Sequence, residues 1–491
     1  MTENKIESII TRLRKQGRDD GSCEVKECAQ GLSKDIWETV SAFANTEGGL
    51  ILLGLSEKNG FIPVDDFDLY KTRDQFISGI GDGGCEGHLT SPPHYTIDHQ
   101  EIEGAQILVI EVDELDSSNK PCYITKRGVP GGSYKRVDDA DILLSANEIF
   151  SLFNACVNTD ADRVPVPRAS LADLDEKHYK QAFAKAEQII PRALYGAKDV
   201  VTKLQRLNYI DGEQNVTKAG LLSAGYYPQQ FYPKLHIDVA VHAGVEKATD
   251  GITRFLDRTI CEGTIGEMLE GAIAAISKNL RRVSIVRGAG RVDELEVPEL
   301  VLREAIANAL IHRDYDSRFD GEAISVDIYD DRIEIVNPGS LWGGKSRSNL
   351  ADGRSCCRNA TLMRLTSISS LPSSAGSPAE GNGTGILLMI NEMLSRQLPK
   401  PEFHPAIDHF RIVLYRPNAG AGKRSKRDVG QATIVSLLLE HGEMSIHDLT
   451  EQSNLTTNQI RNRTRELLED GVIEATAPST SRHRKYRINR K

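Results

Sequence analysis

Residues 299–316, ELVLREAIANALIHRDYD, form the stretch that most limits how this chain can fold. Their spacing predicts a helix with one apolar face and a second face that carries Glu304, Asn308 and His312, one turn apart from each other. A carboxylate one turn before a carboxamide can position water and, through the amide oxygen, a hard divalent cation. Solvated helix faces show the same pattern, so its meaning depends on the residues that follow.

The residues after this helix continue the pattern of a phosphate-binding site. Residues 324–336 alternate apolar and polar side chains and predict a hairpin, which ends at Asn337-Pro338-Gly339. A long polar segment, which we expect to act as a flexible lid over residues 343–379, separates this turn from the glycine-rich sequence EGNGTG at 380–385 and an apolar helix. Glycines before a helix allow backbone amides to approach phosphates at its positive N-terminus.

With these elements in this order, residues 297–415 resemble the GHKL ATPases, the family of gyrase, heat-shock chaperones and histidine kinases. The resemblance is to a divergent subgroup whose helix ends His-Arg-Asp-Tyr. The resemblance implies an α/β sandwich that binds ATP and Mg²⁺. Glu304 matches the family's water-activating acid, and Asn308 matches its magnesium ligand. The other positions implied to bind the cofactor are His312, Asn337, Gly339, Gly381, Gly383, Thr384 and Gly385.

The resemblance has one departure. The Asp-x-Gly-x-Gly motif of the family is Asn337-Pro338-Gly339 here, so an amide replaces the carboxylate that accepts a hydrogen bond from the adenine amino group. ATP binding is implied, whereas hydrolysis and adenine selectivity stay open.

Composition limits the class of protein. A chain of 491 residues holds about three domains on the usual length prior. No apolar run reaches the roughly 18 residues of a membrane span, and the start MTENKIESII lacks the features of a secretion signal, so we expect a cytoplasmic protein that binds no membrane. The eight cysteines form no C-x-x-C pair, which argues against zinc and disulfide frameworks. A net charge of −10 confines nucleic-acid binding to local surfaces.

Residues 1–155 predict an α+β domain. Its segments Glu24-Val25-Lys26, Ala42 to Gly49 (AFANTEGG) and the strand end Gly54-Leu55-Ser56-Glu57 resemble the Schlafen/AlbA-like nucleic-acid-binding domain. The resemblance implies that this domain, including Lys26, contacts nucleic acid.

Some Schlafen proteins are RNA endonucleases with three acidic residues, and their positions correspond here to Asp19, Glu24 and Glu57. Three carboxylates could hold a divalent ion that activates water. The alternative is that Glu24 pairs with Lys26 across the sheet while Asp19 and Glu57 are exposed loop acids.

The remaining segments predict a connecting module and a DNA-binding tail. Residues 156–296 form helices and a winged-helix-like element to which we assign no chemistry, and residues 417–430 form a basic linker. Residues 431–491 predict a winged helix-turn-helix with helices at 431–440, 445–452 and 457–470 and a hairpin after them. The residues expected to touch bases or phosphates are Asn458, Gln459, Arg461, Asn462, Arg465, Arg482, Arg484 and Lys485.

The sequence thus predicts an α+β multidomain chain with an AlbA/Schlafen-like α+β domain, a GHKL-type α/β sandwich and a C-terminal winged helix-turn-helix. The leading hypothesis is an ATP-controlled regulator, transcriptional or defence-type, that binds DNA or RNA and forms a dimer or higher homo-oligomer. Two alternatives are a metal-dependent RNA or tRNA endonuclease switched by ATP, and an ATP-driven assembly protein.

Overall fold

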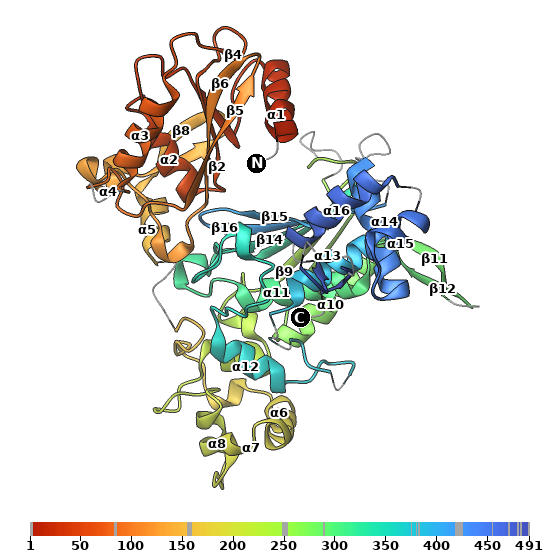
Figure 1. The fold of residues 1–491 in the computed structure, drawn as a ribbon. Helices are drawn as coiled ribbons and strands as arrows, with labels where there is room; N and C mark the ends of the chain where they lie inside the picture. Colours follow the sequence, from red (N-terminus) through yellow and green to blue (C-terminus); the bar gives the residue numbers. More distant parts are fainter. Residues whose placement is uncertain are drawn as a thin grey trace. The chain divides into compact units, whose positions relative to one another are not determined.

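The computed structural model describes residues 3–82, 86–154, 160–247, 254–287, 290–374, 376–379, 381, 383–417, 426–453, 455–469, 472–478, 481 and 484–489. The chain divides into two compact units (Figure 1). The N-terminal unit contains Met1–Val157, Ser340–Asn349 and Pro405–Asp408. The C-terminal unit contains Asn158–Gly339, Leu350–His404 and His409–Lys491.

A four-stranded sheet organises the N-terminal unit. Its order is β1 (Cys23–Lys26), β2 (Gly49–Leu53), β6 (Ala105–Val112) and β5 (Tyr95–Ile102). β1 runs parallel to β2, and the other two pairings are antiparallel. The remaining elements are α1 (Glu3–Gln16), α2 (Ile36–Asn45), β3 (Leu55–Ser56), β4 (Ile62–Pro63), α3 (Leu69–Ile80), α4 (Gly128–Gly132), β7 (Tyr134–Val137), β8 (Ala140–Leu143) and α5 (Ala146–Asn154).

Both faces of this sheet are buried, which explains why β2 reads as a continuous apolar run. Leu50 and Leu52 point into a core that contains the apolar side chains of α1. Ile51 and Leu53 point to the opposite side, into a core formed with α2 and α3. The expected α+β domain is therefore a sheet covered by helices on both sides.

Asn45, the asparagine of the AFANTEGG segment, holds α2 to two neighbouring chain segments. Its Nδ2 donates to the carbonyl oxygens of Cys122 and Tyr134, at 2.8 and 2.9 Å, and its Oδ1 accepts from the amide of Cys122 at 2.7 Å. The side chain is only 2% exposed. The three bonds satisfy backbone groups that would otherwise be buried without partners.

A six-stranded sheet organises the C-terminal unit. Its order is β10 (Asp257–Cys261), β9 (Ile237–Val241), β13 (Ile324–Ile328), β14 (Arg332–Pro338), β16 (His409–Tyr415) and β15 (Glu402–Pro405). β9 and β13 are parallel. We expected the nucleotide-binding domain to begin at residue 297. Instead β9 and β10, from the segment read as a connector, complete its sheet, because parallel pairing with β13 joins strands that are far apart in the sequence.

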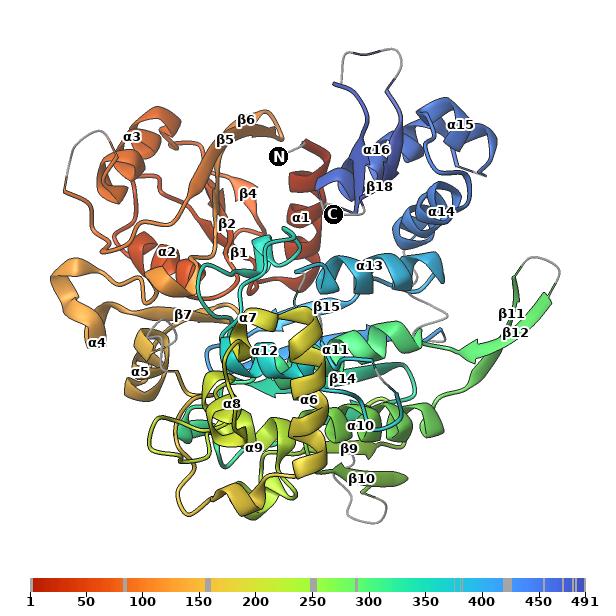
Figure 2. The same cartoon turned by 90° about the horizontal axis from the view of Figure 1, so that it is seen from below.

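Three helices accompany this sheet. α10 (Ile265–Asn279) packs on β9 and β10, α11 (Glu299–His312) packs on β14, and α13 (Gly385–Ser395) packs beside α11. Figure 2 shows α10 and α11 next to each other over the strands. A hairpin of β11 (Arg282–Arg287) and β12 (Gly290–Leu295) precedes α11.

The expected lid contains a buried helix. α12 (Ala360–Ile368) packs against α6 (Glu176–Ile189) and α9 (Lys218–Ala224), and its Leu362, Leu365 and Ile368 are fully buried. The expectation of a flexible lid is wrong for these residues because their apolar side chains have a core to join. Two short helices, α7 (Pro191–Leu194) and α8 (Val200–Arg206), complete this module.

The C-terminal segment folds as the predicted winged helix. It comprises α14 (Lys426–His441), α15 (Ile446–Glu451), α16 (Thr457–Glu469) and the hairpin of β17 (Ile473–Ala475) and β18 (Tyr486–Ile488). Ser445 caps α15 as expected, since its side chain accepts from the amide of Asp448. α14 begins five residues earlier than the predicted 431, inside the expected linker.

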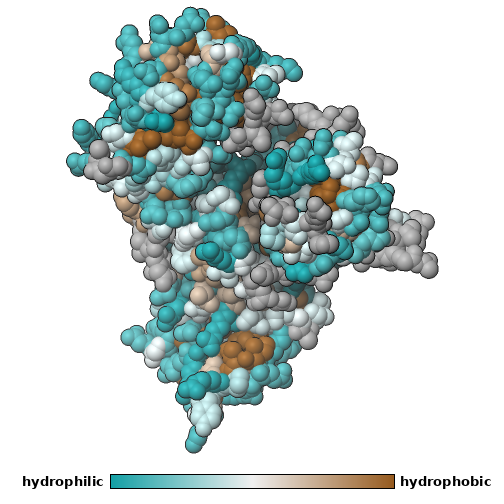
Figure 3. Space-filling model, in the orientation of Figure 1, coloured by the Kyte–Doolittle hydropathy of each residue, from teal (hydrophilic) through white to brown (hydrophobic). Residues whose placement is uncertain are grey.

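The surface drawn in Figure 3 is mainly hydrophilic, and its hydrophobic patches are small and separate. In the described part of the chain, no helix is both long enough and apolar enough to span a membrane.

We predict that Asn45→Ala lowers the free energy of unfolding of the N-terminal unit by on the order of 3 kcal/mol, because three hydrogen bonds are lost and buried backbone groups lose their partners. Both tryptophans of the chain, Trp37 and Trp342, belong to this unit. Urea unfolding followed by tryptophan fluorescence therefore reports on it alone. Asn59→Ala, at an exposed loop position, is the control, and equal stability of both variants would contradict the prediction.

Candidate nucleotide and nucleic-acid sites

The acid and the amide of the predicted nucleotide site meet on α11. Nδ2 of Asn308 donates to Oε1 of Glu304 at 3.0 Å. Glu304 also lies against Gly385, the first residue of α13, because a Cβ built on Gly385 would be 1.9 Å from Oε1 of Glu304. The carboxylate thus faces the positive N-terminus of a helix, where a negative charge is stabilised. The glycine at 385 permits this approach.

The glycine-rich turn before α13 packs against the expected lid. Gly381 and Gly383 have positive φ angles of 71° and 73°. A Cβ on Gly383 would lie 2.8 Å from the carbonyl oxygen of Gly353 and 2.8 Å from the amide of Ser355, both backbone atoms that cannot easily move. Thr384 occupies the N-cap position of α13, without a side-chain capping bond. Residues 380 and 382 of the motif lie outside the described residues.

Asn337 occupies the end of β14. It shares the core-facing side of the strand with Ile333 and Ile335, the side that α11 covers. The residue is 6% exposed, and its Oδ1 is buried without a hydrogen-bond partner. A buried acceptor in this state costs free energy until a donor reaches it.

Two residues that sequence reasoning missed surround the neighbouring Gly339. Nη1 of Arg358 and Oδ2 of Asp314 lie 3.2 Å apart, and a Cβ on Gly339 would be 2.4 Å from both side chains. The amide of Asp314 donates to the carbonyl oxygen of Pro338 at 3.0 Å. Asp314 belongs to the HRDY sequence, which was the available signal, whereas Arg358 reaches the site only through the folded lid segment.

His312 was expected to bind the cofactor. Burial, together with the positive charge of Arg358, lowers its pKa to about 4, so the imidazole is neutral at physiological pH. The arginine that follows, Arg313, is 2% exposed and donates to the carbonyl oxygens of Phe319 and Glu322. Arg313 therefore stabilises the loop that follows α11.

The first part of the expected lid belongs to the N-terminal unit. The chain enters that unit after Gly339 and leaves it before Leu350. Oγ of Ser117 donates to the carbonyl oxygen of Leu341 at 3.0 Å, and the amide of Arg347 donates to Oε2 of Glu114 at 3.1 Å. The Arg347 guanidinium also pairs with the carboxylate of Glu47.

The acidic trio of the N-terminal unit comes together around Asp19. The amide of Asp19 donates to Oε1 of Glu57 at 3.3 Å, and the amide of Val25 donates to Oδ2 of Asp19 at 2.9 Å. Burial, assisted by the negative charges of Glu24 and Glu57, raises the pKa of Asp19 to about 7 despite the amide of Val25. Asp19 is thus a buried acid, not the exposed loop acid of the alternative reading.

Basic side chains neutralise Glu24. Its Oε1 lies 2.8 Å from Nζ of Lys26, and its Oε2 lies 2.8 Å from Nη1 of the buried Arg136. Lys26 also pairs with Asp35 at 2.8 Å, and these carboxylates raise its pKa although burial opposes the shift. Lys26 therefore forms ion pairs with two carboxylates, those of Glu24 and Asp35. Within the described ranges, no three His, Cys, Asp or Glu side chains are arranged to hold a metal ion.

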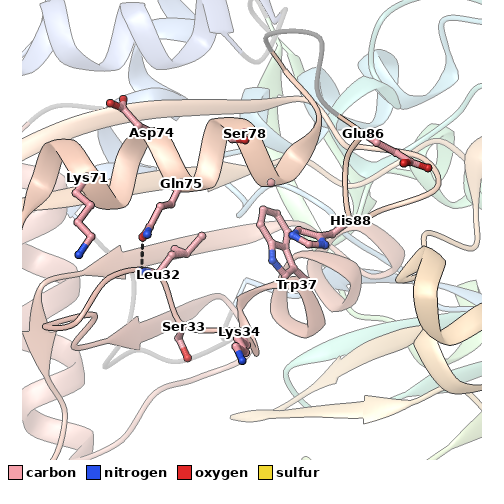
Figure 4. A pocket seen from close by; sticks show the side chains of 11 residues that line it. Leu32, Ser33, Lys34, Trp37, Lys71, Asp74, Gln75, Ser78, Glu86 and His88 are labelled. Atoms are coloured by element: carbon pink, nitrogen blue, oxygen red, sulfur yellow. Dashed lines mark hydrogen bonds between the residues drawn. The ribbon is translucent and has the colours of Figure 1, made fainter.

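A groove of about 660 Å³ lies between α3 and the segment before α2 (Figure 4). The rings of Trp37 and His88 contact each other at one end, with centroids 5.0 Å apart. Sequence reasoning did not anticipate this groove, because its walls come from three separate segments. Its lining residues are Leu32, Ser33, Lys34, Trp37, Lys71, Asp74, Gln75, Ser78, Gly79, Glu86 and His88.

The third helix of the winged domain presents a polar stripe. Asn458, Arg461, Asn462 and Arg465 are exposed, and each of them lies three or four residues from two of the others, so they share one face of α16. Gln459 differs from them. Its Oε1 accepts from the amide and hydroxyl of Thr456 at 2.8 and 3.0 Å, and this bond caps α16.

The wing residues that were expected to contact phosphates differ in their surroundings. Lys485 is exposed, but the guanidinium of Arg484 stacks on the ring of Tyr486, with its carbon 5.2 Å from the centroid. Part of the Arg484 side chain therefore packs within the hairpin. Arg482 lies outside the described residues.

Three family models match the chain and confirm the predicted fused architecture. Residues 19–145 match "Schlafen, AlbA_2", residues 321–414 match "Putative ATP-dependent DNA helicase recG C-terminal" of the histidine-kinase-type ATPase class, and residues 433–474 match "Winged helix-turn-helix DNA-binding". The second match begins after α11, so Glu304 and Asn308 lie outside it.

Two solved structures are also similar. The DIP2311 protein from Corynebacterium diphtheriae has 18% identity and a TM-score of 0.40, with 95% of this chain and 92% of that chain covered. The N-terminal domain of a RecG-related protein from Nitrosomonas europaea, described as a putative ATP-dependent DNA helicase, has 28% identity and a TM-score of 0.22, with 28% and 94% covered. None of the curated proteins matches the chain.

We predict that the stability of the N-terminal unit falls between pH 5 and pH 8 by on the order of 2 kcal/mol through Asp19 alone. The pKa of Asp19 is raised to about 7, so the folded state binds the extra proton at pH 5 and loses it as the pH rises through 7. Asp19→Asn keeps an acceptor for the amide of Val25 and removes this slope. Urea unfolding at several pH values, followed by tryptophan fluorescence, measures it, and equal slopes in both proteins would contradict the assignment.

Proposed function

We propose that this protein is a nucleotide-controlled, nucleic-acid-binding regulator in which ATP and Mg²⁺ at the α11–α13 site change how the winged helix engages DNA. The observation that carries the proposal is the position of α13. This helix begins at the glycine-rich turn and ends in the core of the winged domain.

α13 contributes side chains to two cores. Met389 and Met393 pack in the main core of the C-terminal unit, together with α11 and the sheet. Ile390 and Leu394, on another side of the same helix, pack with Ile434 and other apolar residues of the winged helix. A helix is stiff over its three turns, so a shift at Gly385 moves the surface on which α14 rests.

The residues at the start of α13 suit a nucleotide triphosphate. The backbone amides and the helix dipole at this point favour phosphate oxygens, and the glycines allow phosphates to approach. Asn308 would hold the Mg²⁺ that a bound ATP brings, and this ion would offset the phosphate charge near Glu304. The buried Oδ1 of Asn337 would accept a hydrogen bond from the base. Phosphates would compete with Glu304 for the N-terminus of α13, and this competition supplies a reason for the helix to move.

A second connection leads to the N-terminal unit. Residues 340–349, which follow the base-binding turn directly in the chain, are held by Glu47, Glu114 and Ser117 of that unit. A nucleotide that reorders Asn337 and Gly339 therefore acts on a segment anchored in the Schlafen-like domain. Along the chain of the proposed regulator, one nucleic-acid-binding module precedes the nucleotide site and another follows it.

The second candidate function is an endoribonuclease switched by the nucleotide, and the juxtaposition of Asp19, Glu24 and Glu57 favours it. The cations at Glu24 count against metal binding in this arrangement. Incubation with a tRNA pool and Mn²⁺ or Mg²⁺ separates the two candidates. Cleavage by the wild-type protein that is lost in Glu24→Ala would establish the nuclease function. RNA that stays intact with the wild-type protein would exclude it.

We predict that Arg461→Ala weakens binding of specific duplex DNA by about 1–3 kcal/mol, because an exposed arginine on α16 can contact a base edge. Fluorescence anisotropy with a selected DNA site measures the change. Arg192→Ala, an exposed arginine on α7, is the charge-matched control. An unchanged affinity in Arg461→Ala would exclude α16 as the reading helix.

We further predict that ATP with Mg²⁺ changes the DNA affinity of the wild-type protein by about 5- to 150-fold, the usual range of coupling between two sites. Asn308→Ala should abolish this change and leave the affinity without nucleotide unaltered. Anisotropy titrations with and without ATP give both values. If the wild-type protein binds DNA equally well with and without ATP, the proposed regulation by nucleotide is refuted.

A further inference from the structure

We propose that the groove between α3 and the segment before α2 holds one unpaired nucleotide of a single-stranded nucleic acid. Its base would lie against His88, and its phosphates would lie near Lys34 and Lys71. The inference rests on the proposed function, because it requires that the N-terminal unit binds nucleic acid. It goes further by naming the surface that binds and the form of nucleic acid that it takes.

An aromatic side chain lies at one end of this groove. The ring of His88 contacts the buried Trp37, with centroids 5.0 Å apart. The amide of His88 donates to the carbonyl oxygen of Gly79 at 2.8 Å, and its carbonyl oxygen accepts from the amide of Thr125 at 2.9 Å. The imidazole is half-buried, and within the described ranges its ring nitrogens have no hydrogen-bond partner. An unpaired base can therefore stack on this ring and bond to its edge.

The two walls of the groove are joined, so its shape exists before a ligand arrives. The amide of Leu32 donates to Oε1 of Gln75 at 2.8 Å, a bond that Figure 4 marks between the two walls. A Cβ on Gly79 would lie 2.2 Å from Cζ2 of Trp37, so α3 packs directly on the indole at this point. A site that is already ordered loses less conformational entropy when it binds a ligand.

Two unpaired lysines line the groove as well. Lys34 and Lys71 are exposed, and neither ammonium group has an ion-pair partner among the described residues. Asp74, which also lines the groove, is paired with the neighbouring Arg73, whose Nη2 lies 2.7 Å from its Oδ1. The two lysines are therefore available to the phosphates of a strand.

The polar groups follow one another along α3 in the order that a nucleotide requires. Lys71 lies in the first turn of α3 and Gly79, beside His88, in the last, about 12 Å away along the helix axis. Figure 4 shows Glu86 at the end where His88 lies. A carboxylate only accepts hydrogen bonds, so it repels phosphate at that end and suits the N–H groups of a base.

The experiment uses Trp37 as a reporter in the full chain. Trp37 and Trp342 are the two tryptophans, so Trp342→Phe leaves Trp37 as the source of tryptophan fluorescence. The probes are a labelled short oligodeoxythymidylate, an abasic oligonucleotide of the same length and a blunt DNA duplex. We expect the oligodeoxythymidylate to quench Trp37. The abasic strand should bind about tenfold more weakly, because it has no base to stack, and the duplex should leave Trp37 unchanged.

Three variants test the contacts by fluorescence anisotropy at several salt concentrations. His88→Ala should weaken binding of the oligodeoxythymidylate by about tenfold and leave the abasic strand unaffected. Lys34→Ala and Lys71→Ala should each reduce the slope of log affinity against log salt concentration by about 0.7. Lys15→Ala is the control, an exposed lysine on α1, which packs on the opposite side of the sheet, and it should leave the slope unchanged. Circular dichroism shows whether each variant is folded, and the lysine variants test the groove even if His88→Ala does not fold.

Each contrary result has its own meaning. If the oligodeoxythymidylate binds without quenching Trp37 and the lysine variants bind it like the wild type, the groove is excluded and the nucleic-acid-binding function stands. Equal quenching by the abasic strand would remove the base from the groove, and equal quenching by the duplex would remove the preference for single strands. If neither single-stranded nor duplex DNA binds to the protein, the proposed function itself is refuted.

Discussion

The arrangement of the C-terminal unit depends on one helix that is buried on two sides. α13 places Met389 and Met393 in the core under the six-stranded sheet, and it places Ile390 and Leu394 in the core of the winged helix. Because different side chains of this helix are buried in the two cores, the packing of both cores depends on the position of α13. The glycine-rich turn and the carboxylate of Glu304 lie at the start of this helix.

Electrostatics decide the local structure at both candidate sites. Glu304 is held at the N-terminus of α13, where the helix dipole compensates its charge and where phosphate oxygens would be stabilised for the same reason. In the N-terminal unit, Arg136 and Lys26 perform the compensation for Glu24, and Asp19 remains a buried acid whose proton is retained to near neutral pH. Basic side chains thus compensate one member of the acidic trio, Glu24, whereas Asp19 is buried without such a partner.

The family models confirm the three domain types that the sequence indicated, and much of this success came from local patterns. The alternation of residues 324–336 gave the hairpin β13–β14, and the Ser445 cap gave the start of α15. The predicted domain boundaries were less accurate than the predicted domain types. The six-stranded sheet begins in the chain with β9, about 60 residues before the expected domain start, because strand pairing across such a distance leaves no periodic signal in the chain.

The sequence by itself determined which groups could act: the Glu304–Asn308 pair one helical turn apart, the glycines before α13, and the polar stripe of α16. Helical and strand periodicities fix these relations within a few residues. Only the tertiary structure decided which of these groups face one another. It brought Arg358 and Asp314 to Gly339, engaged Gln459 in a cap and Lys26 in ion pairs, and buried Oδ1 of Asn337 without a partner. Such relations depend on packing between segments distant in the chain, and burial and compensation of charge are properties of that packing.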